Sequence, residues 1–231
     1  MQQNGCIALC YLAADGENAA VVAARGGIEA VVGAMGVHGS SAGLQEHACL
    51  ALCSLSENEE NRVAVAVGGG IEAVVSAMGA HLSRVGVQRS GCQALMNLTV
   101  DAENRVTVAE RGGIEAVVRA MGAHGSSAGV QEVGCRALRN LTALNAENKV
   151  AVAAGGGIAA VVRAMGAHAS SAVVQEHGCG ALNNIVLSDA GLQSQVRSAG
   201  AVPLVKKALS AFPGQGMLQT WGKALLERIG A

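Results

Sequence analysis

Aromatic residues, proline and charge are all scarce in this chain of 231 residues. It has one Trp, one Tyr, one Phe and two Pro, and charged residues make up 14%. The shortage of charge excludes a disordered tail, which would be polar and highly charged. The shortage of aromatics disfavours an aromatic-rich β sandwich. Since 51% of the residues are apolar, mainly Ala, Val, Leu, Ile and Met, the composition favours a core of close-packed helices.

An excess of positive charge is also missing. The net charge is −1 with an isoelectric point near 6.6, so we expect no binding to nucleic acid or to anionic lipid. No apolar run approaches the roughly 18 residues of a membrane span. The opening Met1-Gln2-Gln3-Asn4 does not read as a signal peptide. We therefore expect a soluble protein of the cytoplasm or nucleus, with its seven cysteines as free thiols.

Motifs typical of zinc proteases and of phosphate-binding loops are absent as well. The sequence contains no His-Glu-x-x-His and no Gly-Lys-Ser/Thr. Glycine is abundant at 32 residues, but it follows no Gly-X-Y period. Runs such as Gly68-Gly69-Gly70 are better interpreted as tight turns between helices than as phosphate-binding loops. We predict a protein that is not an enzyme and needs no cofactor.

What the chain does have is a repeat. Cysteines recur at intervals of 43, 43, 43 and 44 residues, and isoleucine and histidine keep the same step. The positions are Cys6, Cys49, Cys92, Cys135 and Cys179; Ile28, Ile71, Ile114 and Ile158; and His38, His81, His124 and His168. A period in the forties, carried by several residue types, indicates a solenoid of stacked helices.

Each repeat is expected to contain three helices. The first opens at a side-chain N-cap such as Asn145 and stops at Gly155-Gly156. The second carries an apolar stripe formed by Ile158, Val161, Val162 and Met165. The third buries one face, formed by Val130, Gly134, Ala137, Leu138 and Leu141, with Gln131, Glu132 and Arg136 predicted to lie off it.

These segments resemble the armadillo repeat family, whose members include importin-α and β-catenin. The resemblance rests on Asp-x-Glu-Asn, then Gly-Gly-Ile-Glu-Ala-Val-Val-x-Ala-Met, then Val-Gln-Glu-x-Gly-Cys-x-Ala-Leu-x-Asn-Leu, and it covers the whole chain. It implies an all-α, right-handed armadillo-type α-solenoid. HEAT repeats, the nearest alternative, lack the separate short first helix.

One repeat domain over 1–231 is predicted. The third helix of a partial repeat occupies 1–13, full repeats occupy 14–56, 57–99, 100–142 and 143–187, and 188–231 is a divergent C-terminal capping repeat. In that last repeat Trp221 is aligned with Gly134. In the first helix, Leu9 and Leu12 are expected to point inward. Ile7 and Tyr11 would then form an outer edge that could self-associate.

The recurring side chains each have a structural interpretation and an alternative. The cysteines are expected to pack as small hydrophobes, with a zinc site bridging Cys6, Cys10, Cys49 and Cys53 as the minor alternative. The histidine series would end second helices, where positive charge complements the helix dipole. His47 and His177 are expected to be solvated. Glycines inside third helices, at Gly5, Gly91, Gly134 and Gly178, predict close approach to another helix.

The resemblance also implies a binding groove lined by third helices. The asparagine that clamps a peptide backbone in the family is matched by Asn97, Asn140 and Asn184, and by Tyr11, Ser54 and Glu227 in the other repeats. The tryptophan position of importin-α falls on Ile7, Leu50, Gln93, Arg136, Gly180 and Lys223. Because that tryptophan series is absent, binding of a lysine-rich nuclear signal is not expected.

Charge is unevenly divided along the chain. Residues 1–120 carry 7 basic and 12 acidic side chains, and residues 121–231 carry 9 and 5, giving net charges of −5 and +4. The predicted groove residues are Asn97, Asn140, Asn184, Arg89, Gln93, Arg136, Arg139 and Glu132. We expect a protein-interaction scaffold for an extended peptide of acidic or hydrogen-bonding character. The alternative is a structural or self-assembling solenoid, natural or of consensus-like design, without a specific groove ligand.

Overall fold

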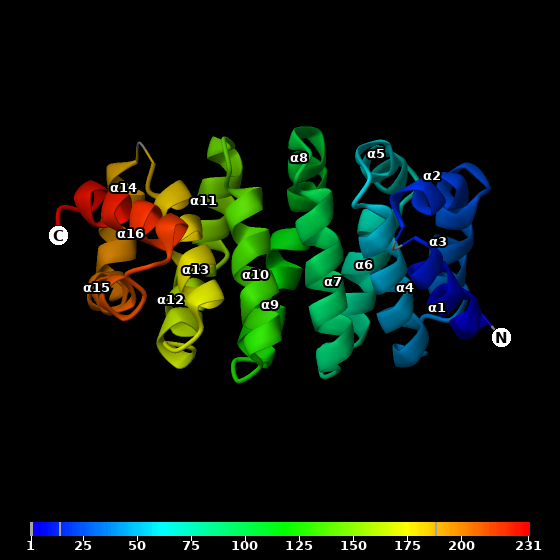
Figure 1. Cartoon of the computed structure of the whole chain (residues 1–231), viewed down its shortest axis with the longest axis horizontal. Helices are drawn as coiled ribbons and strands as arrows, with labels where there is room; N and C mark the ends of the chain where they lie inside the picture. The colour runs from blue at the N-terminus through cyan, green and yellow to red at the C-terminus, as the bar shows by residue number, and fades with distance from the viewer. Residues whose placement is uncertain (1, 14, 188) are drawn as a thin grey trace. The chain divides into compact units, whose positions relative to one another are not determined.

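A computed structural model describes residues 2–13, 15–187 and 189–231 of the chain, without the side chains of Gln2 and Gln3. Over these residues the fold is all-α, with sixteen helices and no strand (Figure 1). They divide into two compact units, which we describe separately: unit 1 within residues 1–120 and unit 2 within residues 121–231. The predicted repeat boundaries at positions 14 and 188 fall outside the described residues, and the single domain over 1–231 stays a prediction.

Unit 1 opens with a lone helix and continues in groups of three. Its helices are α1 Gln2–Leu12; α2 Gly16–Ala24, α3 Gly27–Val37 and α4 Ala42–Leu55; α5 Glu59–Val67, α6 Gly70–Ala80 and α7 Val85–Leu98; and α8 Ala102–Glu110 with the start of α9 Gly113–Ala123. Within each group, the first helix has 9 residues, the second 11 and the third 14.

Unit 2 repeats this pattern of lengths, except that its last third helix has 13 residues. After the end of α9 it contains α10 Ala128–Leu141; α11 Ala146–Ala154, α12 Gly157–Ala167 and α13 Ala172–Ile185; and α14 Ala190–Ser198, α15 Ala201–Ala211 and α16 Gly216–Arg228. The prediction of three-helix repeats is confirmed.

The helix boundaries follow from local chemistry. The side chain of Asn145 accepts a hydrogen bond from the Asn148 amide and caps α11, as predicted. Between α11 and α12, Gly156 has φ 81°, the left-handed conformation that favours glycine. A Cβ on the next residue, Gly157, would lie 2.4 Å from Val152 Cγ1 and 2.8 Å from its carbonyl oxygen. The paired glycines therefore permit both the sharp turn and the close packing after it.

Glycines inside the third helices mark close helix packing, as predicted for three of the four. A Cβ on Gly91 would lie 2.5 Å from Met78 Cγ, and one on Gly134 would lie 2.6 Å from Met121 Cγ. Gly178 meets Met165 in the same way. The close approach is between the second and third helices of one repeat. The prediction was wrong for Gly5, which has no such neighbour within 4 Å among the described residues.

A glutamine in each of α4, α7, α10 and α13 is buried, contrary to the expectation that Gln131 lies off the core face. Gln131 is 2% exposed, and its Nε2 donates to the carbonyl oxygens of Met121 at 2.9 Å and His124 at 3.0 Å. The last turn of a helix leaves carbonyls without intrahelical partners, and Gln131 provides a donor to Met121 and a second one to His124, which also accepts from the Ser127 amide. The same paired bonds are made by Gln45, Gln88, Gln175 and Gln219.

The bonds of Gln219 correct the alignment of the last repeat by one residue. Counting from Gln219 as from Gln131, the counterpart of Gly134 is Gly222, not Trp221. A Cβ on Gly222 would lie 2.8 Å from Leu209 Cδ2, so this glycine also permits close packing against the second helix. By the same count, the position of the importin-α tryptophan falls on Ala224 and not on Lys223. The position of the peptide-clamping asparagine falls on Arg228 and not on Glu227.

The histidines at the ends of second helices link neighbouring repeats. His38, His81 and His168 are C-cap residues, as predicted, but the rings of His81 and His168 also bond to a carbonyl one repeat away. His81 Nε2 lies 2.7 Å from the Gly39 oxygen, and His168 Nε2 lies 2.8 Å from the Gly125 oxygen. Each ring therefore joins the end of one second helix to the loop after the preceding one.

The cysteines behave as predicted for a packed core. Six of the seven are buried, and burial raises the pKa of Cys49, Cys92, Cys135 and Cys179 to about 12. Cys10 is the exception, being partly exposed. Among the described residues no cluster of His, Cys, Asp or Glu could hold a metal ion.

The first helix departs from expectation at one residue. Leu12 is 50% exposed, so the prediction that it points inward was wrong. Cys6 and Ala13 are the buried residues of this segment. Tyr11 is 78% exposed, and Ile7 is partly exposed.

Within the described ranges, no single helix has the length and apolar content to cross a membrane. Three pairs of first and second helices meet those criteria only when taken together, and each pair is bent by 69–71°.

Candidate functional site

The third helices of each unit pack side by side and form what we call the third-helix surface. In unit 1 it consists of α1, α4 and α7, and in unit 2 of α10, α13 and α16 (Figure 1). The predicted site residues fall into two groups on these surfaces. Arg89, Gln93 and Asn97 lie on α7 in unit 1. The other five lie on α10 and α13 in unit 2: Glu132, Arg136, Arg139, Asn140 and Asn184.

In unit 1 the site is built around Asn97. Its Nδ2 donates to the Cys53 carbonyl oxygen at 3.0 Å and contacts Cys53 Sγ at 3.3 Å. Its Oδ1 accepts no hydrogen bond from the described residues. Gln93, about one turn before it, is partly exposed, and Arg89, about two turns before it, is exposed. The carboxamide is thus fixed to the preceding third helix by its nitrogen, while its oxygen remains available.

In unit 2 Asn184 makes the equivalent bond. Its Nδ2 donates to the Arg139 carbonyl oxygen at 3.0 Å, and its Oδ1 likewise has no donor among the described residues. Asn140 is engaged differently, because its Oδ1 accepts a hydrogen bond from Arg139 Nη2 at 3.3 Å. Asn97 and Asn184 therefore share an anchor, whereas Asn140 differs from both because its Oδ1 is already engaged.

Arg139 lies at the centre of the unit 2 surface. Its guanidinium stacks on the Trp221 ring, with Cζ 5.0 Å from the ring centroid, and its Nη1 lies 3.2 Å from His177 Nδ1. Gly180 leaves room for this stack, since a Cβ there would lie 2.8 Å from Trp221 Cε3 and 2.9 Å from Arg139 Cδ. We call Arg139, Asn140, His177, Gly180 and Trp221 the Arg139 cluster.

The protonation of the cluster follows from its surroundings. Burial, together with the positive charges of Arg139 and Arg136, lowers the pKa of His177 to about 4. Since His177 is partly buried, the prediction that it is solvated was wrong. It is neutral at pH 7, so its Nδ1 can accept the Arg139 hydrogen bond. Burial and the nearby Arg136 also lower the pKa of Arg139, which Glu176 opposes.

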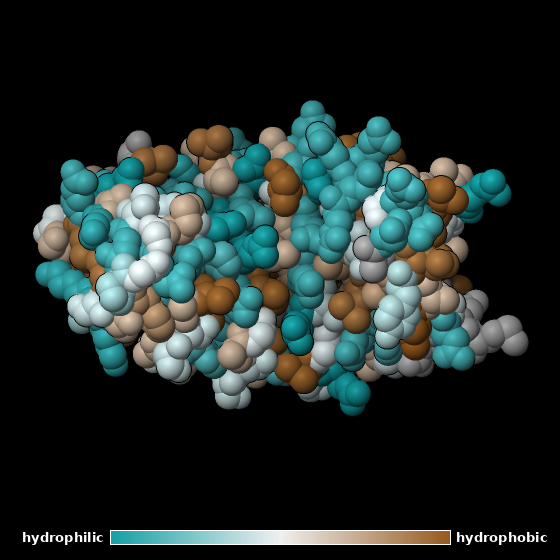
Figure 2. All heavy atoms as spheres, in the orientation of Figure 1, coloured by the Kyte–Doolittle hydropathy of each residue, from teal (hydrophilic) through white to brown (hydrophobic). Residues whose placement is uncertain are grey.

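The remaining predicted residues are more open. Arg136 is exposed and Glu132 is partly exposed, and neither forms a salt bridge in the described part of the chain. Figure 2 shows hydrophilic atoms gathered over α10, which carries both. At the C-terminal end of the surface, Arg228 donates a hydrogen bond to Asn183 Oδ1. Arg228 occupies the position that the misaligned last repeat assigned to Glu227.

Sequence reasoning missed His177 and Trp221 as parts of the site. Both lie two residues after the glutamine that makes the paired bonds in their helix, at a position where α4, α7 and α10 carry His47, Ser90 and Val133. The change in residue type at one repeat position was a usable signal. The one-residue error in aligning the last repeat concealed it, because Trp221 was assigned to a packing position.

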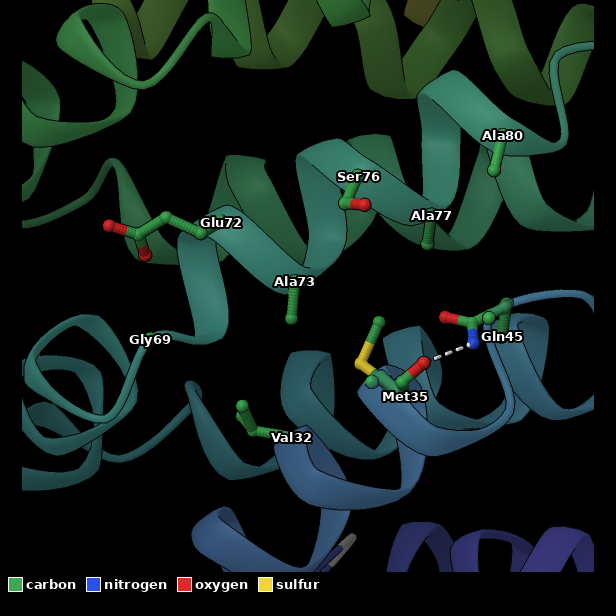
Figure 3. A pocket seen from close by; sticks show the side chains of 11 residues that line it. Val32, Met35, Gln45, Gly69, Glu72, Ala73, Ser76, Ala77 and Ala80 are labelled. Carbon is green, nitrogen blue, oxygen red and sulfur yellow. Dashed lines mark hydrogen bonds between the residues drawn. The ribbon is translucent and has the colours of Figure 1, made fainter.

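The second helices enclose cavities of another kind. Between α3 and α6, a cavity of about 440 Å³ is lined by small and apolar residues, with Val32 and Met35 of α3 facing Ala73 and Ala77 of α6 (Figure 3). Equivalent cavities of about 150 and 360 Å³ follow along the second helices of units 1 and 2. They recur because Gly and Ala fill little volume, and their linings suggest no shared chemistry. The third-helix surfaces are the better candidate site.

Known structures resemble this chain over nearly its whole length. An engineered protein aligns with a TM-score of 0.86 and 24% identity, covering 99% of this chain and 91% of that chain. A designed armadillo repeat protein in complex with the peptide (KR)4 aligns with a TM-score of 0.82 and 19% identity, covering 98% and 92%.

A natural protein shows the same architecture. A structure from a study of the interaction between cadherin and beta-catenin aligns with a TM-score of 0.82 and 20% identity, covering 93% of this chain and 39% of that chain. No protein-family model matches the sequence, and no curated protein matches it. The sequence prediction is confirmed at the level of architecture: the chain has the armadillo repeat fold.

Proposed function

We propose that this protein is a non-enzymatic scaffold that binds an extended peptide segment of a partner along its third-helix surfaces. The observation that carries the proposal is the state of Asn97 and Asn184. Each carboxamide is fixed through Nδ2 to the main chain of the preceding third helix, and each Oδ1 is left without a donor. A fixed acceptor on a binding surface is what an extended peptide backbone, with its unpaired N–H groups, can use.

Fixing the carboxamides beforehand favours binding. A side chain that is already ordered loses less rotamer freedom when a ligand binds, a saving of about 0.5–1.5 kcal/mol for each side chain. The solved armadillo structures support the choice of ligand, since one of them holds a peptide and another concerns a cadherin partner. A receptor for lysine-rich peptides needs tryptophan side chains that can contact the lysines. In this chain the only tryptophan contacts its own Arg139 instead, so the surface differs from that of such a receptor.

We propose that the partners are peptides and not nucleic acid or membranes. We place the protein in the cytoplasm or nucleus. Its near-neutral net charge and free buried thiols support that assignment. No cofactor is required, because the role needs only a surface.

The test is selection of a random peptide library by the wild type and by an Asn97→Ala, Asn140→Ala, Asn184→Ala triple variant. We expect the selected peptides to bind the triple variant at least about tenfold more weakly, the equivalent of 1.4 kcal/mol. A matched control carries Ser76→Ala, Ser170→Ala and Gln195→Ala, three exposed residues off the third helices. Equal binding by wild type and triple variant, with unchanged helical circular dichroism, would refute the proposal.

A structural or self-assembling role is the second candidate, and the exposed side of α1 favours it. Tyr11 and Leu12 are 78% and 50% exposed, and Ile7 adds apolar area beside them. Light scattering over a range of concentrations separates the two roles. A mass that grows with concentration, and that returns to the monomer value with Tyr11→Ser and Leu12→Ser, supports assembly. A constant monomer mass eliminates it.

A further inference from the structure

Arg139 is a partly buried cation whose contacts are all with neutral groups. Its guanidinium meets the Trp221 ring, His177 Nδ1 and Asn140 Oδ1. No carboxylate lies within salt-bridge distance of it in the described residues. Burying a cation costs free energy unless a counter-charge compensates, and three neutral contacts compensate only in part. Within the described ranges, no carboxylate is therefore directly paired with Arg139.

The surroundings raise the demand for negative charge. Arg136 lies close enough to disfavour the charged form of Arg139, and Glu176 offsets this only partly. Unit 2 as a whole has an excess of four basic over acidic side chains. Potential of one sign that is not neutralised within the protein attracts a ligand of the opposite sign.

The geometry fixes the guanidinium for such a ligand. Arginine carries five N–H groups in a planar fork, and the bonds to His177 and Asn140 use two of them. The contact of Arg139 Cζ with the Trp221 ring, 5.0 Å from its centroid, helps to hold the guanidinium in place, and the other three N–H groups have no acceptor among the described residues. Two N–H groups on one edge of a guanidinium match the two oxygens of a carboxylate.

We propose that the Arg139 cluster is a receptor for the carboxylate of an aspartate or glutamate side chain in the bound peptide. This inference rests on the proposed function and adds a requirement for a particular side chain at a particular place. The carboxylate would accept hydrogen bonds from the free edge of Arg139, with Arg136 adding charge at the rim. A lysine or arginine of the partner is disfavoured here, because Arg139 already occupies the face of Trp221.

The only tryptophan of the chain reports directly on this site. Since Trp221 is the sole Trp, its fluorescence senses the Arg139 cluster and no other part of the molecule. The probes are the peptides (Ser-Glu)4 and (Ser-Gln)4, which present alternate side chains on one side of an extended chain. We expect (Ser-Glu)4 to bind at least about tenfold more tightly than (Ser-Gln)4 and to change the Trp221 emission.

Three variants test the assignment. Arg139→Gln should abolish the preference for (Ser-Glu)4. Gly180→Ala should reduce it without changing any charge, because the added Cβ displaces Trp221 and Arg139. Arg163→Gln, which removes an exposed positive charge from α12, is the matched control and should retain the preference. Equal affinity for the two peptides, or a preference that survives Arg139→Gln, would overturn the proposal.

A small probe separates this inference from the proposed function. N-acetyl-glutamate methylamide at millimolar concentration carries the acidic side chain without an extended backbone. If the third-helix surfaces bind no extended peptide, this probe should still change the Trp221 emission more than its glutamine counterpart. If library peptides bind but neither (Ser-Glu)4 nor the small probe affects Trp221, the receptor is refuted and the scaffold remains.

Discussion

The two units share their packing contacts and differ in their third-helix surfaces. In both, a buried glutamine bonds two carbonyls at the end of a second helix, and a histidine joins neighbouring repeats. The surface of unit 1 centres on Asn97 and the thiol of Cys53, whereas that of unit 2 centres on Arg139 and Trp221. Residues that recur thus hold the repeats together, and residues that vary at fixed positions give each surface its chemistry.

The charges of the two units strengthen this contrast. Unit 1 has a net charge of −5 and unit 2 of +4 on the same pattern of helices. If the recurring contacts are equivalent, matched substitutions in the two units should lower the free energy of unfolding by similar amounts. If the varying residues carry the function, changes to them should act on one unit only. The following predictions test these statements.

The largest effect is expected from filling the glycine sites. Gly91→Leu and Gly134→Leu would each place a branched side chain where even a Cβ comes within 2.5 or 2.6 Å of a methionine. Overpacking of this size should destabilise the protein by about 3 kcal/mol or more. Thermal and urea unfolding followed by circular dichroism measure it, and the two losses should agree within about 1 kcal/mol.

Alanine is the control at the same two sites. The first full repeat already has Ala48 at this position, and it is fully buried. A methionine side chain can move aside, and alanine gains up to about 1 kcal/mol of helix propensity over glycine. Gly134→Ala should therefore change stability by less than about 1 kcal/mol. A loss from Gly134→Leu no larger than that from Gly134→Ala would contradict the packing argument.

The next largest effect concerns the buried glutamines. Gln131→Met keeps the length of the side chain but removes the donor to the Met121 carbonyl oxygen and leaves the His124 carbonyl oxygen with the Ser127 amide, at a cost of about 1–3 kcal/mol. Gln88→Met should cost less, because Gln88 Oε1 is itself buried without a partner among the described residues. Urea unfolding of both variants gives the difference. A larger loss for Gln88→Met would show that the unpaired oxygen carries no penalty.

The glutamines also show what the sequence could and could not predict. The repeat, the three helices and the buried cysteines follow from periodicity and helix faces, and all were predicted. A glutamine next to the core face looks like a surface residue, because periodicity does not reveal that helix-end carbonyls lie within its reach. Only the fold brings Gln131 to Met121 and His124.

The candidate site was predictable to a similar degree. Asn97, Asn140 and Asn184 came from the family pattern and lie on the third helices as expected. The cluster around Arg139 required the side chains of α10, α13 and α16 to meet, which spacing within one helix cannot show. Trp221 was also assigned to the wrong position, since the last repeat lacks Cys and Met at the places that fix the alignment elsewhere.

A smaller effect is expected from the histidines that join repeats. His81→Ala in unit 1 and His168→Ala in unit 2 each remove one partly exposed hydrogen bond to a loop carbonyl. Each should cost about 1 kcal/mol, the usual net value of such a bond. His38→Ala is the control, since no bond of its ring to another repeat is present among the described residues. If all three variants have the same melting temperature, the hydrogen bond between repeats contributes nothing to stability.

The smallest effect is a dependence on pH that belongs to unit 2 alone. The pKa of His177 is about 4 in the folded protein and near 6.5 when unfolded, so the unfolded state binds more protons between these values. Stability should therefore fall as the pH drops from about 6.5 to 4 and be fully retained above 6.5. Protonated His177 can no longer accept the Arg139 hydrogen bond, so Trp221 emission should change over the same range.

His177→Gln should remove both effects, whereas His47→Gln, at the matching position of α4, should leave them intact. Because His177 is only partly buried, solvent screening keeps the stability change small, and the fluorescence of Trp221 is the more sensitive measurement.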